Sequence, residues 1–282
     1  PMQHPRSDRA LGAAALLALA LSCAPGTPSD QEALTAVPPG ALGGPLHDPA
    51  GLVAHWAFDE GSGTTIHDSS LSGIDLSLFG AKWVQGRVGG ALAFDGGGDV
   101  AGLPGGVPAA LTDLDVGTVS LWFRFESIPG TNQIHPILHL GAGSGAPLQS
   151  AFVVEVGHFE TGTDLYFTIL DRKGHLALCF DSGFDLSPAK WYHFAAVVGP
   201  DFNTGYLDGV ELVDREYNAG DASTSKFVVD VVSPDVLWLG RGFLGKVTGP
   251  QEHHGAIDEV RFHSRPLTAA EVGELYAEGV AP

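Results

Sequence analysis

The chain has 282 residues, of which 39 are glycine, 19 are proline and 17% are charged, and its hydrophobic content of 44% supports a folded core and excludes a disordered chain. Its formal net charge of −19 disfavours nucleic acid and anionic lipid head groups as partners, and is compatible with neutral sugars, cationic partners, divalent metal ions or mere solubility. Two cysteines are too few for a disulfide scaffold.

Residues 1–23 resemble a bacterial lipoprotein signal peptide. Two arginines precede the apolar run 10–21, which is too short to span a bilayer and matches a signal-peptide core. The run ends in Leu19–Cys23, which resembles a lipobox, so we expect Cys23 to become a lipidated N-terminus. The alternatives are an ordinary secretory peptide cut after Ala24 and a buried Cys23.

A flexible tether is predicted for residues 24–50, where proline, glycine and small residues dominate without an apolar period. We expect one domain over residues 51–282, because no further linker interrupts the chain. A lipid anchor followed by a tether would place this domain at a membrane of the bacterial cell envelope; without the anchor it would be secreted.

Strand signals recur at short intervals from Gly51 onward. The glycine-rich segment Gly86–Gly90 predicts a tight turn, and the alternating residues Ala91–Asp95 predict a strand that ends on a carboxylate. A hairpin is indicated by Asp208 and Gly209 between two apolar runs. The other predicted strands are 52–58, 75–79, 118–126, 136–140, 151–156, 165–170, 176–180, 191–198, 204–207, 210–213, 228–232, 236–239 and 257–262.

The segment 118–126 also carries the candidate binding surface. Every second residue from Val119 to Phe125 is apolar and should face the core, so Trp122, Arg124 and Glu126 point the other way. Sugars stack on tryptophan faces and are held by polar side chains, which makes these three the candidate ligand-binding residues. The alternative is that Trp122 only covers a second core layer.

One helix is predicted, near the end of the chain. Thr268 and Glu271 form a capping box, and Gly279 ends the helical pattern. With about a dozen strands, a single late helix and no alternation of strands with helices, the sequence predicts an all-β protein. Its architecture would be a two-sheet antiparallel sandwich with a short C-terminal helix.

Seven motifs, in their order and spacing, resemble the laminin-G-like, concanavalin A-like jelly-roll domain of bacterial secreted proteins. The resemblance covers about residues 51–280 and is specific for the fold but weak for function. The motifs are VAHWAFDEGSG (53–63), GRVGGALAFDG (86–96), TVSLWFRF (118–125), WYHFAAVV (191–198), LDG (207–209), LWLG (237–240) and GAIDEVRFHSRPLTAAE (255–271).

The resemblance implies a structural Ca²⁺ that bridges an early loop and the last strand. Asp258 is the best candidate ligand and Asp95 the second, while Asp59 (or its neighbour Glu60) and Asp99 are weaker. Calcium takes six to eight oxygen ligands, and a buried aspartate is costly without a cation or N–H donors. The alternatives are a turn aspartate at Asp95 and, at Asp258, a buried carboxylate hydrogen-bonded to the N-terminal strand.

Catalytic signals are weak. The same sandwich fold hosts β-glucan hydrolases, and EVGHFE (155–160) has their glutamate spacing, but Gly157 replaces the central aspartate, so only Glu155 and Glu160 remain as a low-probability pair. The turn at Gly141–Gly145 is no serine nucleophile elbow. Cys179 lies in an apolar run and is predicted to be a buried, inert thiol.

Histidine patterns do not predict a metal site. His253 and His254 lie between glycine and proline residues and are interpreted as a surface-loop pair; zinc there would need a third ligand that the sequence does not identify. His135 and His139 are four residues apart, but the Pro136 between them favours a strand over a helix.

The leading functional hypothesis is a non-catalytic binding or adhesion module on a lipid-anchored envelope protein. Its partner would be a glycan or an extracellular protein, with no nucleic acid, and the module would be stabilised by calcium. The alternatives are a polysaccharide-degrading glycoside hydrolase on the same fold and a purely structural envelope protein.

Overall fold

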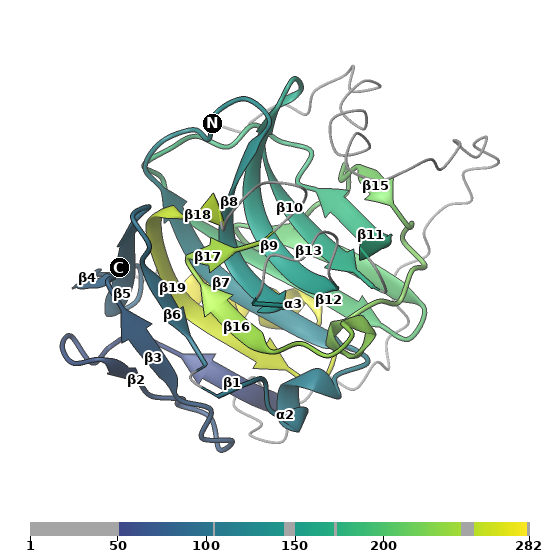
Figure 1. Cartoon of the computed structure of the whole chain (residues 1–282). Helices are drawn as coiled ribbons and strands as arrows, with labels where there is room; N and C mark the ends of the chain where they lie inside the picture. Colours follow the sequence, from purple (N-terminus) through teal and green to yellow (C-terminus); the bar gives the residue numbers. More distant parts are fainter. Residues whose placement is uncertain (1–50, 104, 144–149, 172–173, 244–250, 281–282) are drawn as a thin grey trace.

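The computed structural model describes residues 51–103, 105–143, 150–171, 174–243 and 251–280. The predictions for the signal peptide, Cys23 and the tether lie outside these residues. Two antiparallel sheets stacked face to face make up most of the described chain (Figure 1). None of the described helices is long and apolar enough to cross a membrane.

The first sheet, which we call sheet A, has eight strands in the described part of the chain. Its last strand in sequence pairs with both neighbours in the path and also with β1, so the N-terminal and C-terminal strands of the domain are hydrogen-bonded to each other. The order is β14 (Val210–Glu211), β13 (Phe202–Leu207), β12 (Tyr192–Gly199), β7 (Gly117–Phe125), β19 (His254–His263), β5 (Gly90–Asp95) and β4 (Lys82–Gln85), with β1 (Leu52–Trp56) beside β19.

The second sheet, sheet B, has nine strands among the described residues. A separate two-stranded ladder, β17 (Arg241–Gly242) with β18 (Gln251–Glu252), follows it in the chain. The order in sheet B is β15 (Tyr217–Ala219), β11 (Leu176–Asp181), β10 (Gly162–Leu170), β9 (Ala151–Phe159), β8 (Gln133–Gly141), β16 (Val236–Leu239), β6 (Val100–Gly102), β3 (Leu76–Phe79) and β2 (Thr65–Ile66). The predicted two-sheet antiparallel jelly-roll sandwich is confirmed.

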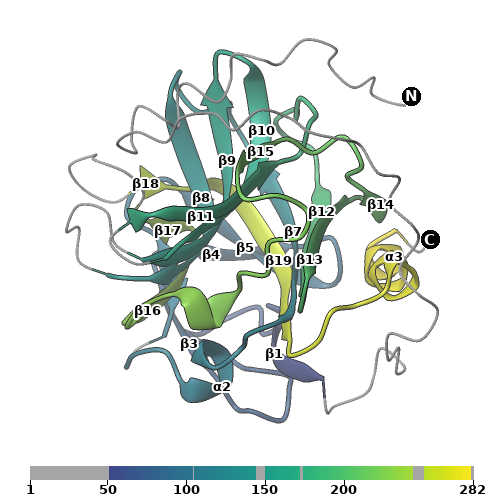
Figure 2. The same cartoon turned by 90° about the vertical axis from the view of Figure 1, so that its right-hand side faces the viewer.

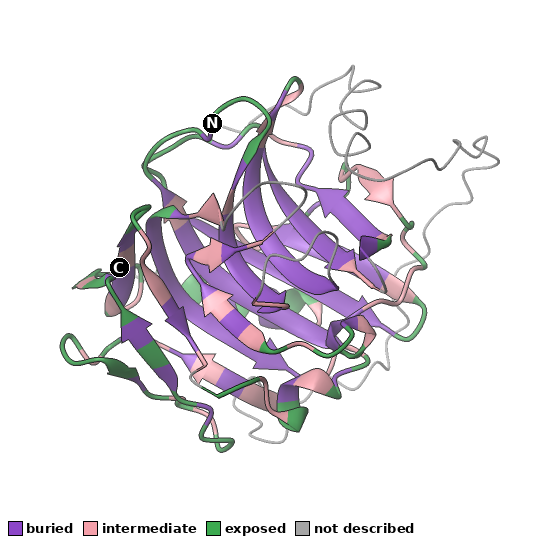
Figure 3. Cartoon of the chain, viewed as in Figure 1, coloured by how far each residue is buried: buried purple, intermediate pink, exposed green. Residues whose placement is uncertain are grey.

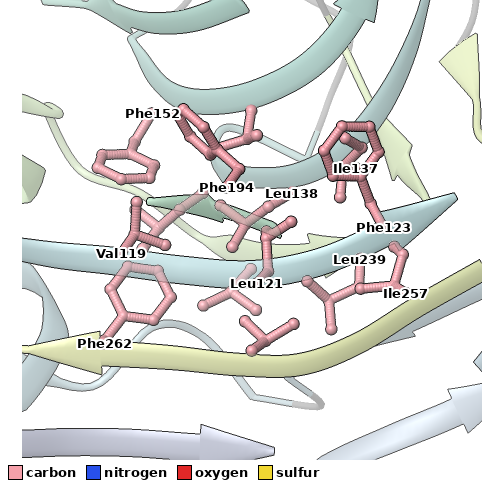
Figure 4. Close-up of a cluster of buried hydrophobic side chains, with 14 of the residues drawn as sticks. Val119, Leu121, Phe123, Ile137, Leu138, Phe152, Phe194, Leu239, Ile257 and Phe262 are labelled. Atoms are coloured by element: carbon pink, nitrogen blue, oxygen red, sulfur yellow. The ribbon is translucent and has the colours of Figure 1, made fainter. Parts of the chain in front are cut away.

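The hydrophobic core lies between the two sheets, and the long central strands are buried along most of their length (Figure 3). Strand β7 shows why: every second residue from Val119 to Phe125 is fully buried and faces the other sheet, as the alternation predicts. Figure 4 shows side chains from both sheets meeting in this core. They are Val119, Leu121, Phe123, Phe194, Ile257 and Phe262 from sheet A, and Ile137, Leu138, Phe152 and Leu239 from sheet B.

The C-terminal helix α3 (Ala269–Glu278) covers part of the outer face of sheet A, away from sheet B (Figure 2). Its N-terminus has the predicted capping box: Glu271 N–H donates to Thr268 Oγ1 at 3.3 Å, and Thr268 N–H donates to Glu271 Oε2 at 2.7 Å. The helix packs through Val272 and Leu275 against apolar side chains of β12 and β13. No described helix covers the outer face of sheet B in the same way (Figure 2).

Two segments differ from the sequence prediction. Residues 228–232 were predicted as a strand, but Val228–Asp230 is the 3-10 helix η2. The Asp230 carboxylate accepts the Phe227 N–H at 3.1 Å and pairs with Lys226 at 2.7 Å, and these local bonds favour a helical turn over a strand. The four-residue helix α2 (Ala109–Thr112) was not predicted.

Candidate functional site

The glycine turn Gly86–Gly90 holds the early and late parts of the chain together. The Asp258 Oδ2 atom on β19 accepts the N–H groups of Arg87 and Val88, at 2.7 and 2.9 Å. From the other end of the chain, Asp59 Oδ1 accepts the Gly90 N–H at 2.7 Å. Backbone N–H groups therefore bind these two carboxylates at the place where the resemblance implies a calcium ion.

Asp258 is fully buried, as expected for a residue on a strand in the core of the predicted sandwich. Burial raises the pKa of Asp258 to about 7, against the lowering effect of its backbone hydrogen bonds. Its Oδ1 atom is buried and has no hydrogen-bond partner among the described residues. Asp258 is therefore a buried, hydrogen-bonded carboxylate, which was the alternative to a calcium ligand. Its donors belong to the glycine turn and not to the N-terminal strand.

The other two predicted calcium ligands lie at a second turn. Asp99 Oδ2 accepts the Asp95 N–H at 2.9 Å, and Asp95 Oδ1 accepts the Gly97 N–H at 2.8 Å. Strand β5 runs from the first turn to the second, and its six residues separate the turns by about 17 Å. The four aspartates therefore do not fit one calcium site. In the described ranges, no three His, Cys, Asp or Glu side chains are arranged to hold a metal ion.

The prediction that Trp122 is exposed for ligand binding is wrong. Trp122 is 2% exposed, because α3 lies over it. Its ring stacks on Tyr276 of the helix at 5.5 Å and lies 5.2 Å from the ring of His193, and the guanidinium of Arg87 lies 5.4 Å from its centroid. The alternative, that Trp122 covers a second core layer, is correct. A sequence pattern shows that the helix is amphipathic, but not where it docks.

Arg124 and Glu126, the neighbours predicted with Trp122, remain partly exposed. They form an ion pair at 2.6 Å, and the Arg124 guanidinium lies 5.5 Å from the ring centroid of Trp191. The partly exposed aromatic ring on this part of sheet A is therefore Trp191, which the sequence analysis treated only as the start of a strand. Because Glu126 neutralises the charge of Arg124, this cluster offers no unpaired cation to a ligand, although the buried Nε atom of Arg124 has no hydrogen-bond partner among the described residues.

A second aromatic cluster lies on the outer face of sheet B, and we call it the Trp238 platform (Trp238, His139, Arg241 and Phe243). In β16 the neighbours of Trp238 face the core, so its indole points outward and is partly exposed. The His139 ring lies nearly parallel to it at 6.1 Å, and the Phe243 ring lies at 5.8 Å. The strand partner on the other side is Gly102, where a side chain would collide with the indole.

Two glycines around Arg241 shape this platform. Gly240 has a φ of 81°, which favours glycine, and a Cβ at this position would collide with the Phe94 ring. At Gly242 a Cβ would lie 3.2 Å from the Cβ of His139, so the chain passes close over β8. The resulting kink carries Arg241 back over Trp238, with 5.7 Å between the guanidinium and the ring centroid. In the sequence, LWLG (237–240) was interpreted only as a fold motif, and this site was not predicted.

Glu155 lies on the same outer face, on β9, and has unusual surroundings. It is 1% exposed, its Oε2 atom has no partner among the described residues, and burial raises its pKa to about 8. Its strand neighbours are Tyr166 on β10 and Pro136 on β8. Glu160 is exposed and lies beyond the end of β9, whose pairing with β10 is regular. The two glutamates are therefore not side by side, as a retaining hydrolase pair would be.

The remaining sequence predictions have mixed outcomes. Cys179 is buried, as predicted, and burial raises its thiol pKa to about 12. The interpretation of His253 and His254 as a surface pair is wrong for His253, which is fully buried. His253 lies between β18 and β19, where its backbone N–H donates to the carbonyl oxygen of Gly240 at 2.8 Å and its Nε2–H group donates to that of Arg124 at 3.1 Å. His254, the first residue of β19, is exposed. His135 and His139 both lie on β8, as expected from Pro136.

Comparison with protein-family models gives a match over residues 95–273 to a laminin G-type model described as the concanavalin A-like lectin/glucanases superfamily. A search of curated proteins gives no significant match. The family match includes Asp95, Asp258 and the whole Trp238 platform.

Solved structures with a similar fold include sugar-binding and toxin domains. Domain 4 of AbnA, an extracellular arabinanase from Geobacillus stearothermophilus solved with arabinotriose, is 20% identical, with a TM-score of 0.54, and the match covers 80% of this chain and 98% of that domain. The binding domain of Paraclostridial Mosquitocidal Protein 1 is 15% identical (TM-score 0.56; 81% of this chain, 52% of that one). A Trypanosoma rangeli sialidase with sialic acid is 16% identical (TM-score 0.53; 95% and 37%).

Proposed function

Because the chain belongs to the concanavalin A-like lectin/glucanases superfamily, we propose that it is a non-catalytic module that binds glycans through the Trp238 platform. The observation that carries this proposal is the partly exposed indole of Trp238, held in place by His139 and Phe243 on the sheet face that no described helix covers. Sugar rings stack on such aromatic surfaces, and neighbouring polar groups fix their hydroxyls. The lipid-anchored envelope location expected from residues 1–50 is part of the same proposal.

A binding role agrees with the rest of the geometry better than catalysis does. The carboxyl pair that the sequence offered for glycoside hydrolysis is not assembled, since Glu160 is exposed beyond the end of the strand that carries Glu155. Domain 4 of the arabinanase AbnA, which has a similar fold, was solved in complex with arabinotriose, and this also favours a sugar-binding role. A purely structural envelope protein would have no use for an exposed aromatic platform.

Trp238→Ala is expected to abolish glycan binding. Removing a stacking tryptophan takes away most of the apolar contact with the sugar, and such anchors typically contribute about 2 kcal/mol or more, roughly a 30-fold loss of affinity. The measurement is a glycan array followed by calorimetry on the strongest binder. The matched control is Trp191→Ala, which removes the partly exposed, arginine-stacked tryptophan of sheet A. Equal binding by both variants and the unmodified protein would contradict the platform.

Stabilisation by calcium is the second part of the proposal. It is supported by the resemblance and does not rest on a preformed cluster of three acidic side chains, since the described residues contain none. The place to test is the Asp95 turn, where Asp95, Asp99 and Glu252 accept backbone N–H groups from residues 95–98 and each carboxylate has a second oxygen. We expect a chelator to lower the Tm by several degrees, since a bound ion that adds a few kcal/mol shifts a domain of this size by that much.

Two variants locate the calcium effect. Asp95→Asn should remove most of the sensitivity to the chelator. Asp258→Asn should leave it in place, because Asp258 lies at the glycine turn, at the other end of β5 from Asp95. The same melting curve with and without chelator would show that calcium does not stabilise the domain.

A further inference from the structure

Among the residues that the structure describes, the charge of Arg241 has no ion-pair partner, although the protein is strongly acidic. The whole chain has 14 lysines and arginines against 33 aspartates and glutamates, so most basic side chains can find a carboxylate. Among the described residues, Arg241 forms no ion pair and its buried Nε atom has no hydrogen-bond partner. Its guanidinium instead lies over the Trp238 ring.

The other arginine that stacks on a partly exposed tryptophan shows the difference. Arg124 lies over Trp191 at nearly the same distance, 5.5 Å against 5.7 Å for Arg241 over Trp238. However, Arg124 is neutralised by Glu126 at 2.6 Å. Both clusters therefore hold an arginine over a tryptophan ring, but only the Arg124 cluster also contains a carboxylate that neutralises the arginine.

The other two described arginines that lie over aromatic rings do not present a free guanidinium beside an accessible ring. Arg87 lies over Trp122, which α3 buries. Arg215 lies over Tyr217 and also donates to two carbonyl oxygens and to the Tyr217 hydroxyl. Within the described part of the chain, the Trp238 platform is thus the one place where an accessible ring and an unneutralised guanidinium meet.

Two carboxylates beside the Trp238 platform accept backbone N–H groups, and neither forms an ion pair with Arg241 among the described residues. Glu252 lies directly across the β17–β18 ladder, but its Oε2 atom accepts the Gly98 N–H at 2.9 Å. Asp235 accepts the Gly143 N–H at 2.6 Å. The imidazole of His139 adds no positive charge at neutral pH, because burial lowers its pKa to about 4. A guanidinium whose neighbours do not neutralise it can bind a carboxylate with two parallel hydrogen bonds.

We infer that the Trp238 platform selects acidic sugars, with the sugar ring on the Trp238 indole and the sugar carboxylate on the Arg241 guanidinium. In uronic and sialic acids the carboxyl group is one bond from the pyranose ring, so one sugar can make both contacts. The net charge of −19 repels polyanions, which points to a glycan with an isolated acidic sugar. Repulsion from distant charges is screened beyond about 8 Å at physiological salt, and does not offset a direct contact. This inference rests on the proposed glycan-binding function.

The test compares acidic oligosaccharides with neutral counterparts by calorimetry. One pair is glucuronosyl-xylotriose and its carboxyl-reduced form, and the other is sialyllactose and its carboxyl-reduced form. We expect at least one acidic probe to bind about tenfold or more tightly than its neutral counterpart, as charge-assisted hydrogen bonds typically give. Arg241→Gln should remove this preference without lowering the Tm, and Arg241→Lys should restore only part of it, because lysine has no planar pair of donors.

The control is Arg124→Gln, which removes the neutralised guanidinium beside Trp191 and should leave the preference unchanged. Equal affinity for acidic and neutral probes, no binding of any acidic probe, or a preference that survives in Arg241→Gln would each overturn the inference. If neutral probes bind and Trp238→Ala abolishes that binding, the proposed glycan-binding function stands while the acidic selectivity fails. If Trp238→Ala changes no glycan binding at all, the proposed function itself fails.

Discussion

Lowering the pH from 7 to 4.5 is expected to unfold the domain. Four histidines are at most 2% exposed, and burial lowers their pKa values to about 4 for one and about 3 for the other three. They are His139, His193, His253 and His263. Each has a buried Nδ1 atom with no hydrogen-bond partner among the described residues, so an added proton there finds no acceptor.

The direction of this effect follows from proton linkage. The imidazoles have pKa values near 6.5 in the unfolded chain and well below that in the fold, so their contribution to stability is complete above pH 6.5 and is lost as the pH falls toward 4. Each contributes about 1.4 kcal/mol per pH unit. Glu155 and Asp258 act in the opposite direction, because their pKa values are raised. His135, which is only partly buried, adds a fifth imidazole, because burial lowers its pKa to about 4. The net uptake of about three protons gives a loss of roughly 4 kcal/mol per pH unit below pH 6.

Urea unfolding measured at several pH values checks this expectation, because the slope of the free energy of unfolding against pH counts the protons taken up. His253→Gln should reduce the slope by about one proton. The matched control is the adjacent and exposed His254, where His254→Gln should leave the slope unchanged. A flat stability profile between pH 6.5 and 4.5 would show that these imidazoles are protonated in the fold or reach acceptors outside the described residues.

Glu155→Gln is expected to stabilise the domain strongly at alkaline pH. The Glu155 pKa rises from 4.5 in the unfolded chain to about 8 in the fold, because the carboxyl group is buried. Its contribution to stability is therefore complete below pH 4.5 and is lost as the pH rises through 8. A neutral amide of the same shape avoids this loss, which amounts to a few kcal/mol above pH 8. We expect the Tm to rise by about 5–10 °C at pH 8.5 and by little at pH 5.

Thermal melting of the variant at both pH values measures the effect. Glu160→Gln is the matched control, because it makes the same chemical change at an exposed glutamate five residues away and should not alter the Tm at either pH. A stabilisation by Glu155→Gln that is equal at pH 5 and pH 8.5 would mean that the carboxyl group does not titrate in this range. Its effect would then come from packing.

Most of the sandwich could be predicted from residue alternation. The apolar residues between Val119 and Phe125 face the core as the period of two requires, and the capping box at Thr268 begins α3 where it was expected. Several short strands were missed because two to four residues are too few to show a period, as in β4 at Lys82–Gln85, although the four-residue strands β3 and β16 were predicted. In Val228–Asp230, a local bond from Asp230 outweighed the β-propensity of the valines.

The candidate site was predicted less well than the fold. The face of a strand on which Trp122 lies follows from alternation, but its burial depends on α3, which is about 150 residues away in sequence and packs on that face. Alternation places Trp238 on an outer face in the same way, and here no described helix follows. The sequence pattern of the two tryptophans is similar, and only their surroundings in the fold separate a core residue from a binding residue.

What the sequence by itself determined was the strand pattern, the terminal helix with its cap, the turn at Gly86–Gly90 and the buried state of Asp258 and Cys179, since each depends on neighbours within a few residues. The tertiary structure alone decided which aromatic ring is accessible, which arginine lacks a carboxylate and which carboxylates share a turn. These properties depend on contacts between segments far apart in the chain. Alternation within one strand already places Glu126 beside Arg124, whereas only the β17–β18 pairing brings Glu252 opposite Arg241 and the fold turns its Oε2 atom to the Gly98 N–H.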